Sequence, residues 1–366
     1  MKSTDNMKTL LTAAALSLAF ASYAQDSTVQ MASPLTFSGY VEAYYSYDLN
    51  KPVDHNRPGF LYSHGRHNEF NINLAFLKAA YNTERIRANL AIAAGTYMNA
   101  NYSAEQGGLK NIYEANAGYK LSSNKNLWLD IGILPSHIGF ESALSKDCWT
   151  LTRSLAAENS PYFESGAKLT YTTAAGKFAI SALALNGWQR ITRVNGNSLM
   201  SWGTQVVVKP NERITLNYST FLGTDKPDSS RTWRIFHNLY GIFQFSDRIG
   251  LTAGFDIGTE QVAKGSSKHH TWYSPVGILR YTPASKWAVA LRGEYFSDKD
   301  GVIIITGTPA GFRTSGISLN LDYLPVTNVA IRLEGRTLHS EDDIFVKNER
   351  GTNNTKAVTF SVAVGF

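Results

Sequence analysis

The sequence is nearly devoid of cysteine: Cys148 is the only one among its 366 residues. A chain with one cysteine forms no internal disulfide framework, so the stability of an exported protein must come from elsewhere. The sequence also lacks any apolar run that approaches the roughly 18 consecutive apolar residues of a transmembrane helix. A disulfide scaffold and a helical membrane protein are therefore both excluded.

Charge is scarce as well. Charged residues make up 17% of the chain, below the roughly 25% typical of soluble domains. Aromatic residues reach 12%, and the formal net charge is only +6. No cluster of lysine and arginine is interleaved with aromatic residues, so the composition argues against a nucleic-acid partner. The chain therefore has few charged side chains with which to cover the exterior of a soluble protein.

The first residues have the pattern of a secretory signal peptide. Two lysines precede an apolar run at 10–20, and the small residues Ser22 and Ala24 follow it. The pattern fits a start at Met1 and a start at Met7 equally. The expected organisation is a signal peptide at 1–24, a short N-terminal segment at 25–34 and a folded region at 35–366.

Strict alternation dominates the chain from about residue 35 to its end. In the last segment the large apolar side chains of Val358, Phe360 and Val362 alternate with the small polar ones of Thr359 and Ser361. A soluble sandwich with one wet face would show the same alternation. Three further features decide between a sandwich and a membrane barrel.

The first feature is the length of the connections, which alternate between tight turns and longer polar stretches. This asymmetry is typical of an outer-membrane barrel, which has short periplasmic turns and longer extracellular loops. The tight turns are predicted at 82–85, 123–126, 174–177, 210–212, 246–248, 283–286 and 325–328.

The second feature is a gathering of aromatic residues near the tight turns, including Tyr81, Tyr119, Trp128 and Trp287. Such residues form a girdle at a membrane interface, where a ring is half wet and half buried. The third feature is the polar face of each strand. It carries Gly, Ala, Ser, Thr and Asn with scattered charges instead of many Lys and Glu residues, which suits a lumen.

The sequence therefore predicts an all-β fold, a transmembrane antiparallel β-barrel of about sixteen strands. A barrel of this size leaves an aqueous channel, because diameter grows with strand number. In lipid the last strand must pair with the first, which places Phe366 in the aromatic belt. The predicted strands span 35–48, 69–81, 86–99, 110–122, 127–136, 163–173, 178–189, 198–209, 213–223, 232–245, 249–262, 271–282, 287–297, 311–323, 329–338 and 356–366.

One long segment, LDIGILPSHIGFESALSKDCWTLTRSLAAENSPYFESGAKLTY at 129–171, resembles the OmpL-like β-barrel porin family of Gram-negative bacteria. The opening FSGYVEAYYSYD at 37–48 and the terminal aromatic extend the resemblance. It implies a pore in the bacterial outer membrane that contacts lipid and passes small hydrophilic solutes. Phe366 is similar to the signal that such proteins present to the barrel-assembly machinery. Glu164 departs from the family, in which an aromatic residue or histidine is expected after Phe163.

In porins generally a long early loop folds inward, and the longest connection here, at 137–162, is the candidate constriction loop. We expect its charges to face lumen arginines and lysine and to sort solutes by charge. The alternative is a loop that caps the barrel from outside, with solvated charges. The candidate constriction residues are Glu141, Lys146, Asp147, Arg153, Glu158, Arg87, Lys168, Arg213, Arg280, Arg292, Arg332 and Arg336.

The expected function is passive diffusion with a weak preference for anions, because the lumen arginines outnumber the lumen carboxylates. Pairing between arginine and carboxylate on neighbouring strands would erase this preference. A homotrimer is common for sixteen-stranded porins, but the sequence identifies no interface. The lumen carboxylates are Asp130, Asp256, Glu294, Asp322 and Glu334.

Two alternatives remain: an outer-membrane barrel enzyme of the protease or lipase type, and a soluble exported β-sheet binding protein. No spacing of Ser, His and Asp assembles a catalytic group. Repeats of about 40 residues, as in a propeller, are lacking. We expect His55, His64 and His67 to be solvated loop side chains without a metal, and Cys148 to be a loop thiol without a role. No cofactor is expected.

Overall fold

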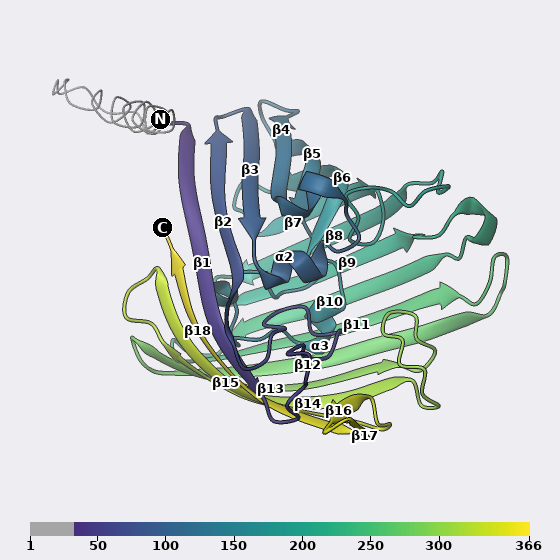
Figure 1. Ribbon diagram of the computed structural model, residues 1–366. Coiled ribbons are helices and arrows are strands. Elements are labelled where there is room, and N and C mark those ends of the chain that lie inside the picture. The colour runs from purple at the N-terminus through teal and green to yellow at the C-terminus, as the bar shows by residue number, and fades with distance from the viewer. Residues whose placement is uncertain (1–32) are drawn as a thin grey trace, which may run out of the picture. The chain divides into compact units, whose positions relative to one another are not determined.

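The computed structural model describes residues 33–366, so the signal peptide predicted at 1–24 and nearly all of the segment at 25–34 lie outside the described residues. Sixteen strands of the described part close into an antiparallel barrel (Figure 1). They are β1 (Leu35–Asp48), β2 (Phe70–Asn82), β3 (Ile86–Ala94), β4 (Ile112–Lys120), β5 (Asn126–Pro135), β6 (Phe163–Thr172), β7 (Phe178–Leu185), β8 (Ser201–Asn211), β9 (Ile214–Gly223), β10 (Arg234–Gln244), β11 (Ile249–Gln261), β12 (His269–Ala284), β13 (Trp287–Asp298), β14 (Phe312–Tyr323), β15 (Val329–Ser340) and β18 (Asn354–Gly365).

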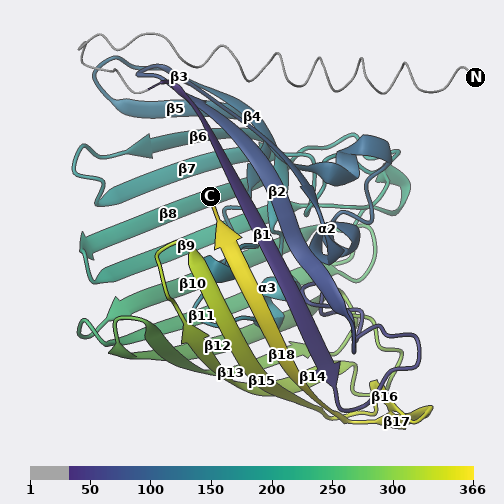
Figure 2. The same cartoon turned by 60° about the vertical axis from the view of Figure 1, so that its left-hand side comes forward.

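Each barrel strand pairs with the next barrel strand along the chain, β15 pairs with β18, and β18 also pairs with β1, so the predicted fold class is confirmed. Figure 2 shows β1 and β18 side by side where the barrel closes. The amide of Phe366 donates to the carbonyl of Gly39 at 3.0 Å, and the amide of Gly39 donates back at 2.6 Å. The Phe366 ring covers Gly39 so closely that a Cβ there would lie 2.4 Å from it. A larger residue at this position would therefore displace the Phe366 ring from the closing seam.

The two faces of the barrel wall differ as the alternation predicts. On β14 the side chains of Ile317 and Leu319 are exposed on the outer face, whereas Ser318 and Asn320 are buried on the lumen side. An outer face of this kind matches hydrocarbon. Within the described residues, no helix has the length and apolar character needed to cross a bilayer.

Aromatic residues lie at the turn end, as predicted, with the rings of Trp287 and Tyr323 4.7 Å apart. The sequence also predicts Trp128 in this girdle, and that prediction is wrong. Trp128 shares the lumen face with Asp130, two positions along β5, and its ring lies 4.3 Å below the guanidinium of Arg87. The alternation of β5 therefore directs this ring to the lumen.

The connections differ between the two ends of the barrel. Short turns join strands at one end, and we number the longer loops at the other end from first to eighth in chain order. The eighth contains a small hairpin of β16 (Phe345–Lys347) and β17 (Arg350–Thr352). The loops span 49–69, 95–111, 136–162, 186–200, 224–233, 262–268, 299–311 and 341–353.

The predicted strand at 86–99 is too long. β3 ends at Ala94, and the helix α2 (Thr96–Asn101) follows. Gly95 joins them with a φ of 133°, and a Cβ at this position would lie 2.4 Å from the carbonyl oxygen of Asn73. A glycine is thus required where the chain leaves the wall and enters the second loop.

The lumen wall is apolar at its loop end, which corrects the expectation of a small polar face. Phe221, Phe236 and Trp272 are buried there. They pack in one cluster with Leu61 of the first loop and Leu155 of the third. Large apolar side chains can occupy lumen positions because inward-folded loops keep water from them.

Candidate functional site

The third loop (136–162) lies inside the barrel and is bonded to several wall strands. A ring nitrogen of His137 lies 2.8 Å from the carbonyl oxygen of Thr220 on β9. The amide of Gly139 donates to the Asn238 side chain on β10 at 3.1 Å. The amide of Leu151 donates to the Asn320 side chain on β14 at 3.0 Å. The loop therefore crosses the lumen.

Two wall arginines hold the backbone of this loop. The Arg332 guanidinium on β15 donates to the carbonyl oxygens of Cys148 at 3.0 Å and Thr150 at 3.3 Å, and it also contacts that of Ser145. Arg292 on β13 donates to the carbonyl oxygen of Thr152 at 2.6 Å. Both side chains are fully buried. Two of the predicted site residues therefore meet the third loop.

Wall carboxylates accept hydrogen bonds from backbone amides of the same loop. Glu334 accepts the amide of Thr152 at 2.6 Å, and Glu294 accepts the amide of Leu155 at 2.7 Å. Glu294 also accepts from Arg336 at 2.9 Å. The short helix of the loop is α3 (Leu155–Glu158). Ser154 caps it by accepting the Ala157 amide at 3.2 Å.

The loop's own charges point in different directions. Arg153 is buried and donates to the loop carbonyls of Ser142 and Ala143. Glu141 accepts the Ser154 amide at 3.0 Å. Lys146 and Asp147 pair with each other at 3.2 Å and are partly exposed. These last two are the most solvated members of the predicted set within this loop.

Glu158 joins the third loop to the first. Its carboxylate accepts the amide of Tyr62 at 2.9 Å and that of Ser63 at 3.2 Å. Burial raises the pKa of Glu158 to about 7, although Arg153 and Arg336 oppose the shift. Burial likewise raises the pKa of Glu141 in the same loop.

The first loop enters the lumen as well, which the sequence analysis missed. His64 is buried with a ring nitrogen 3.1 Å from the carboxylate of Glu42 on β1. His67 is also buried, and its ring accepts the Asp48 amide at 2.9 Å. The expectation of solvated histidines is therefore wrong at these two positions. Their only sequence signal was a cluster of histidines in one loop.

The second loop contributes an aromatic cluster. Tyr97 and Met98 of α2 are buried, and the rings of Tyr102 and Phe163 stack with centroids 4.0 Å apart. Glu164, the departure from the family pattern, lies fully buried with its carboxylate 2.8 Å from His137. A carboxylate at this rim is accommodated because histidine provides its partner.

The remaining predicted cations lie away from the third loop's backbone. Arg87 donates to Asp130 at 2.6 Å on the lumen face of the barrel wall. Lys168 has no ion pair within the described residues and contacts only the Gln205 side chain, at 3.5 Å. Arg280 is also unpaired in the described part, 6.0 Å from the Trp149 ring.

Arg213 is not a lumen residue, contrary to the prediction. It lies in the turn between β8 and β9, pairs with Asp247 at 3.2 Å, and has a side chain that is 59% exposed. The prediction extended the alternation of β9 to residue 213, but this residue belongs to the two-residue turn that precedes the strand. It therefore belongs to the turn end of the barrel and not to the constriction set.

A serine, a histidine and a carboxylate lie together where the first and third loops meet β1. Ser145 and His64 both bond to Glu42 and not to each other, so they do not form a nucleophile–base pair. Among residues 33–366 no group of three or more His, Cys, Asp or Glu side chains is placed to hold a metal ion. Buried Cys148 lies near the carbonyls of Ser142 and Leu144.

Solved structures with this fold are bacterial outer-membrane proteins. The anion-selective porin from Comamonas acidovorans is 11% identical, with a TM-score of 0.60 over 91% of this chain and 99% of that one. The outer membrane channel DcaP of Acinetobacter baumannii is 11% identical, with a TM-score of 0.59 over 91% and 97%. OmpT of Vibrio cholerae in its trimer form is 8% identical, with a TM-score of 0.56 over 91% and 99%.

No curated protein matches the chain. The family described as "Putative beta-barrel porin-2, OmpL-like" matches residues 34–366. This match covers every strand of the barrel, and the similar structures share its closed antiparallel architecture. The chain belongs to this OmpL-like β-barrel porin family of the bacterial outer membrane.

Proposed function

We propose that the protein is a passive diffusion channel for small hydrophilic solutes, narrowed by the third loop. The observation that carries the proposal is the set of bonds from Arg292, Arg332, Glu294 and Glu334 to the loop backbone. A loop held by charge-assisted hydrogen bonds on several strands keeps one position across the lumen. Such a loop can set the width and polarity of the remaining pathway.

The predicted anion preference needs a different basis from the one that the sequence suggested. The arginines near the third loop are paired with Glu294, Glu334 and Asp322. Paired charges give little net field in the pathway. Lys168 and Arg280 have no ion pair among the described residues, and they support a weak preference for anions.

Reversal potentials in planar bilayers under a salt gradient test both parts of the proposal. We expect conductance with weak anion selectivity in the wild type. The double variant Lys168→Gln/Arg280→Gln should move the reversal potential toward cation selectivity. Arg213→Gln is the matched control, because Arg213 lies in a turn, and should leave it unchanged. A non-conducting barrel contradicts the channel, and cation selectivity in the wild type contradicts the role of the two cations.

We also propose that the barrel assembles as a homotrimer through β4 to β7. The outer face there carries the small side chains of Ala117, Ala167, Ala182 and Ala184 between larger ones such as Ile131. The small residues leave hollows into which side chains of a second copy can pack, and ring-shaped assemblies are usual for homo-oligomers. Cross-linking in native membranes should give trimers that Ala182→Trp disrupts and that Leu319→Trp, on β14, leaves intact. Monomers alone in the wild type contradict this proposal.

A further inference from the structure

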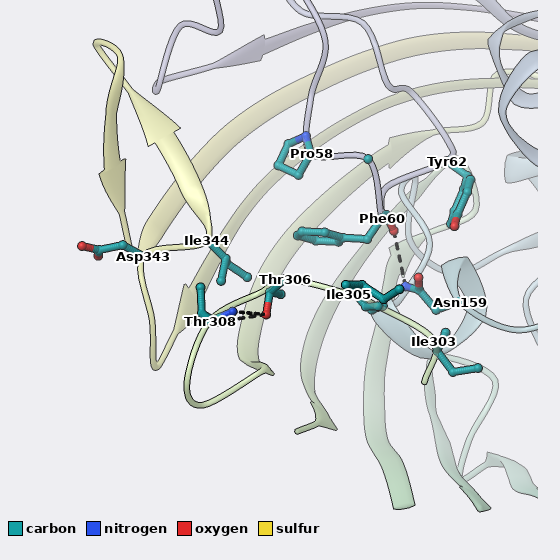
Figure 3. A pocket seen from close by; sticks show the side chains of 12 residues that line it. Pro58, Phe60, Tyr62, Asn159, Ile303, Ile305, Thr306, Thr308, Asp343 and Ile344 are labelled. Carbon is teal, nitrogen blue, oxygen red and sulfur yellow. Dashed lines mark hydrogen bonds between the residues drawn. The ribbon is translucent and has the colours of Figure 1, made fainter. Parts of the chain in front are cut away.

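A cavity of about 430 Å³ opens at the loop end between the first, seventh and eighth loops. Figure 3 shows Phe60, Ile305 and Ile344, one from each of these loops, converging around it. Ile305, the last of four consecutive aliphatic residues in the seventh loop, is 84% exposed. Exposed apolar surface of this kind in a concavity marks a binding site.

Hydrogen bonds and ring packing hold the walls of this cavity in place. The carboxylate of Asp298 at the end of β13 accepts the amides of Val302, Ile303 and Ile304 at 2.7 to 2.9 Å, which fixes the seventh loop. The Phe60 ring packs on Phe312, with centroids 4.8 Å apart. The aliphatic side chains are thus presented in one arrangement, so a ligand need not order them on binding.

A second cavity of about 250 Å³ adjoins the first. The two share Tyr62, Asn159 and Ile303 in their linings. The second is polar and is lined further by Arg190 and Arg234, among others. A cavity with a partly aliphatic wall therefore lies directly beside one that is lined by charged side chains, at the mouth of the barrel.

The charges of the second cavity are nearly all engaged. Glu158 accepts the first-loop amides, and Asp225 accepts the Trp188 amide at 3.0 Å. Arg234 pairs with Glu260 at 2.7 Å. Burial raises the pKa of Asp225, and Arg234 and Arg190 oppose that shift. Arg190 alone forms no hydrogen bond or ion pair among the residues that the structure describes. Its charge acts on Asp225, but its guanidinium N–H groups are available to a ligand.

We propose that the two cavities form one binding site for a small amphipathic carboxylate. Its apolar part lies against Phe60, Ile303 and Ile305, and its carboxylate pairs with Arg190. A branched alkyl group fits the aliphatic lining, and a planar guanidinium matches a carboxylate in geometry and charge. The proposal thereby gives one class of solute for the channel. Binding does not depend on the proposed channel function, and only the onward passage of the solute rests on it.

Calorimetric titration of the full protein in lipid nanodiscs tests the site without requiring conduction. The probe is 4-methylpentanoate, and its neutral isostere 4-methylpentanamide serves as the matched ligand. We expect the carboxylate to bind roughly tenfold more tightly than the amide, as for loss of one charged hydrogen bond. Arg190→Gln should erase the difference between the two ligands. Arg193→Gln, in the same loop but bonded to the Ser198 carbonyl, should preserve it.

The apolar half is tested by Ile305→Asn, which should weaken both ligands alike because Ile305 is exposed and contributes only apolar contact. Val262→Asn, an exposed valine of the sixth loop, is the control. Equal binding of carboxylate and amide, unchanged binding by Arg190→Gln, or the same heats with empty nanodiscs would each overturn the site. Binding without conductance would reject the channel and keep the site. Conductance without binding would do the reverse.

Discussion

At the scale of single residues, the lumen contains a hydrogen-bonded network of buried charged side chains. Arg153, Arg292 and Arg332 are fully buried, and each donates to carbonyl oxygens of the third loop or to wall carboxylates. Burying an ion is costly unless its hydrogen bonds are all made. Where every charge in this network has its hydrogen bonds, the network holds the third loop in one conformation. Where a buried carboxylate lacks a full set of partners, its pKa is raised.

Glu158 gives a residue-scale prediction about pH. Its pKa is raised from 4.5 to about 7 in the folded protein, so the folded state binds more protons between these values. The free energy of unfolding therefore falls as pH rises through this window, by about 3 kcal/mol at most. Glu158→Gln should remove that part of the slope, measured as the temperature at which the folded gel band is lost at pH 5 and pH 8.

Two further loop carboxylates, Glu141 and Asp225, have raised pKa values too and are present in both proteins. The informative quantity is therefore the difference between wild type and variant. Glu349→Gln, at an exposed position of the eighth loop, should behave as the wild type. An unchanged slope in Glu158→Gln would show that this carboxylate is ionised in the folded state.

At the scale of elements, the third loop depends on bonds from strands that are distant in sequence. Arg332→Met removes the donor to its carbonyls, and breaking a buried charged network costs about 3–5 kcal/mol. We expect larger and noisier single-channel conductance, because the loop is less firmly held. Arg87→Met breaks an ion pair with Asp130 away from this loop and should leave the noise unchanged. Identical traces for both variants would contradict a constricting role.

The last strand gives a second prediction at this scale. Phe366 pairs with Gly39 through its backbone and covers that glycine with its ring. Removing the ring exposes the seam of β1 and β18, and we also predict that it removes the assembly signal. Phe366→Ala should lower the fraction of folded, heat-modifiable protein in outer membranes. Phe360→Ala, which removes an outward ring of the same strand, is the control and should have the smaller effect.

At the scale of the whole molecule, a belt of apolar side chains surrounds the barrel. Leu77, Ile131 and Trp202 are each more than half exposed on its outer face. Such a surface requires lipid or detergent. We expect the purified protein to stay monodisperse only with detergent, and its gel mobility to change on boiling. A monodisperse sample without detergent would contradict the membrane fold.

The sequence by itself determined the number of strands, their faces and the closure of β18 on β1. These follow from a period of two and from turn lengths, and both are local properties that a barrel in lipid must satisfy throughout. The alternation failed where the chain left the wall, at α2 and at Arg213. The expectation of small polar side chains at lumen positions also failed where loops cover the lumen face, as at Trp272.

Only the tertiary structure decided which loops enter the lumen and which charges they meet. Ser145 bonds to Glu42, and Thr152 bonds to Glu334, 182 positions away in the chain. Similarly, Asp225 pairs with Arg234 and accepts the Trp188 amide, whereas Arg190 has no ion pair among the described residues. No local pattern specifies such pairs, because they arise when the closed barrel brings distant strands within reach of one folded loop.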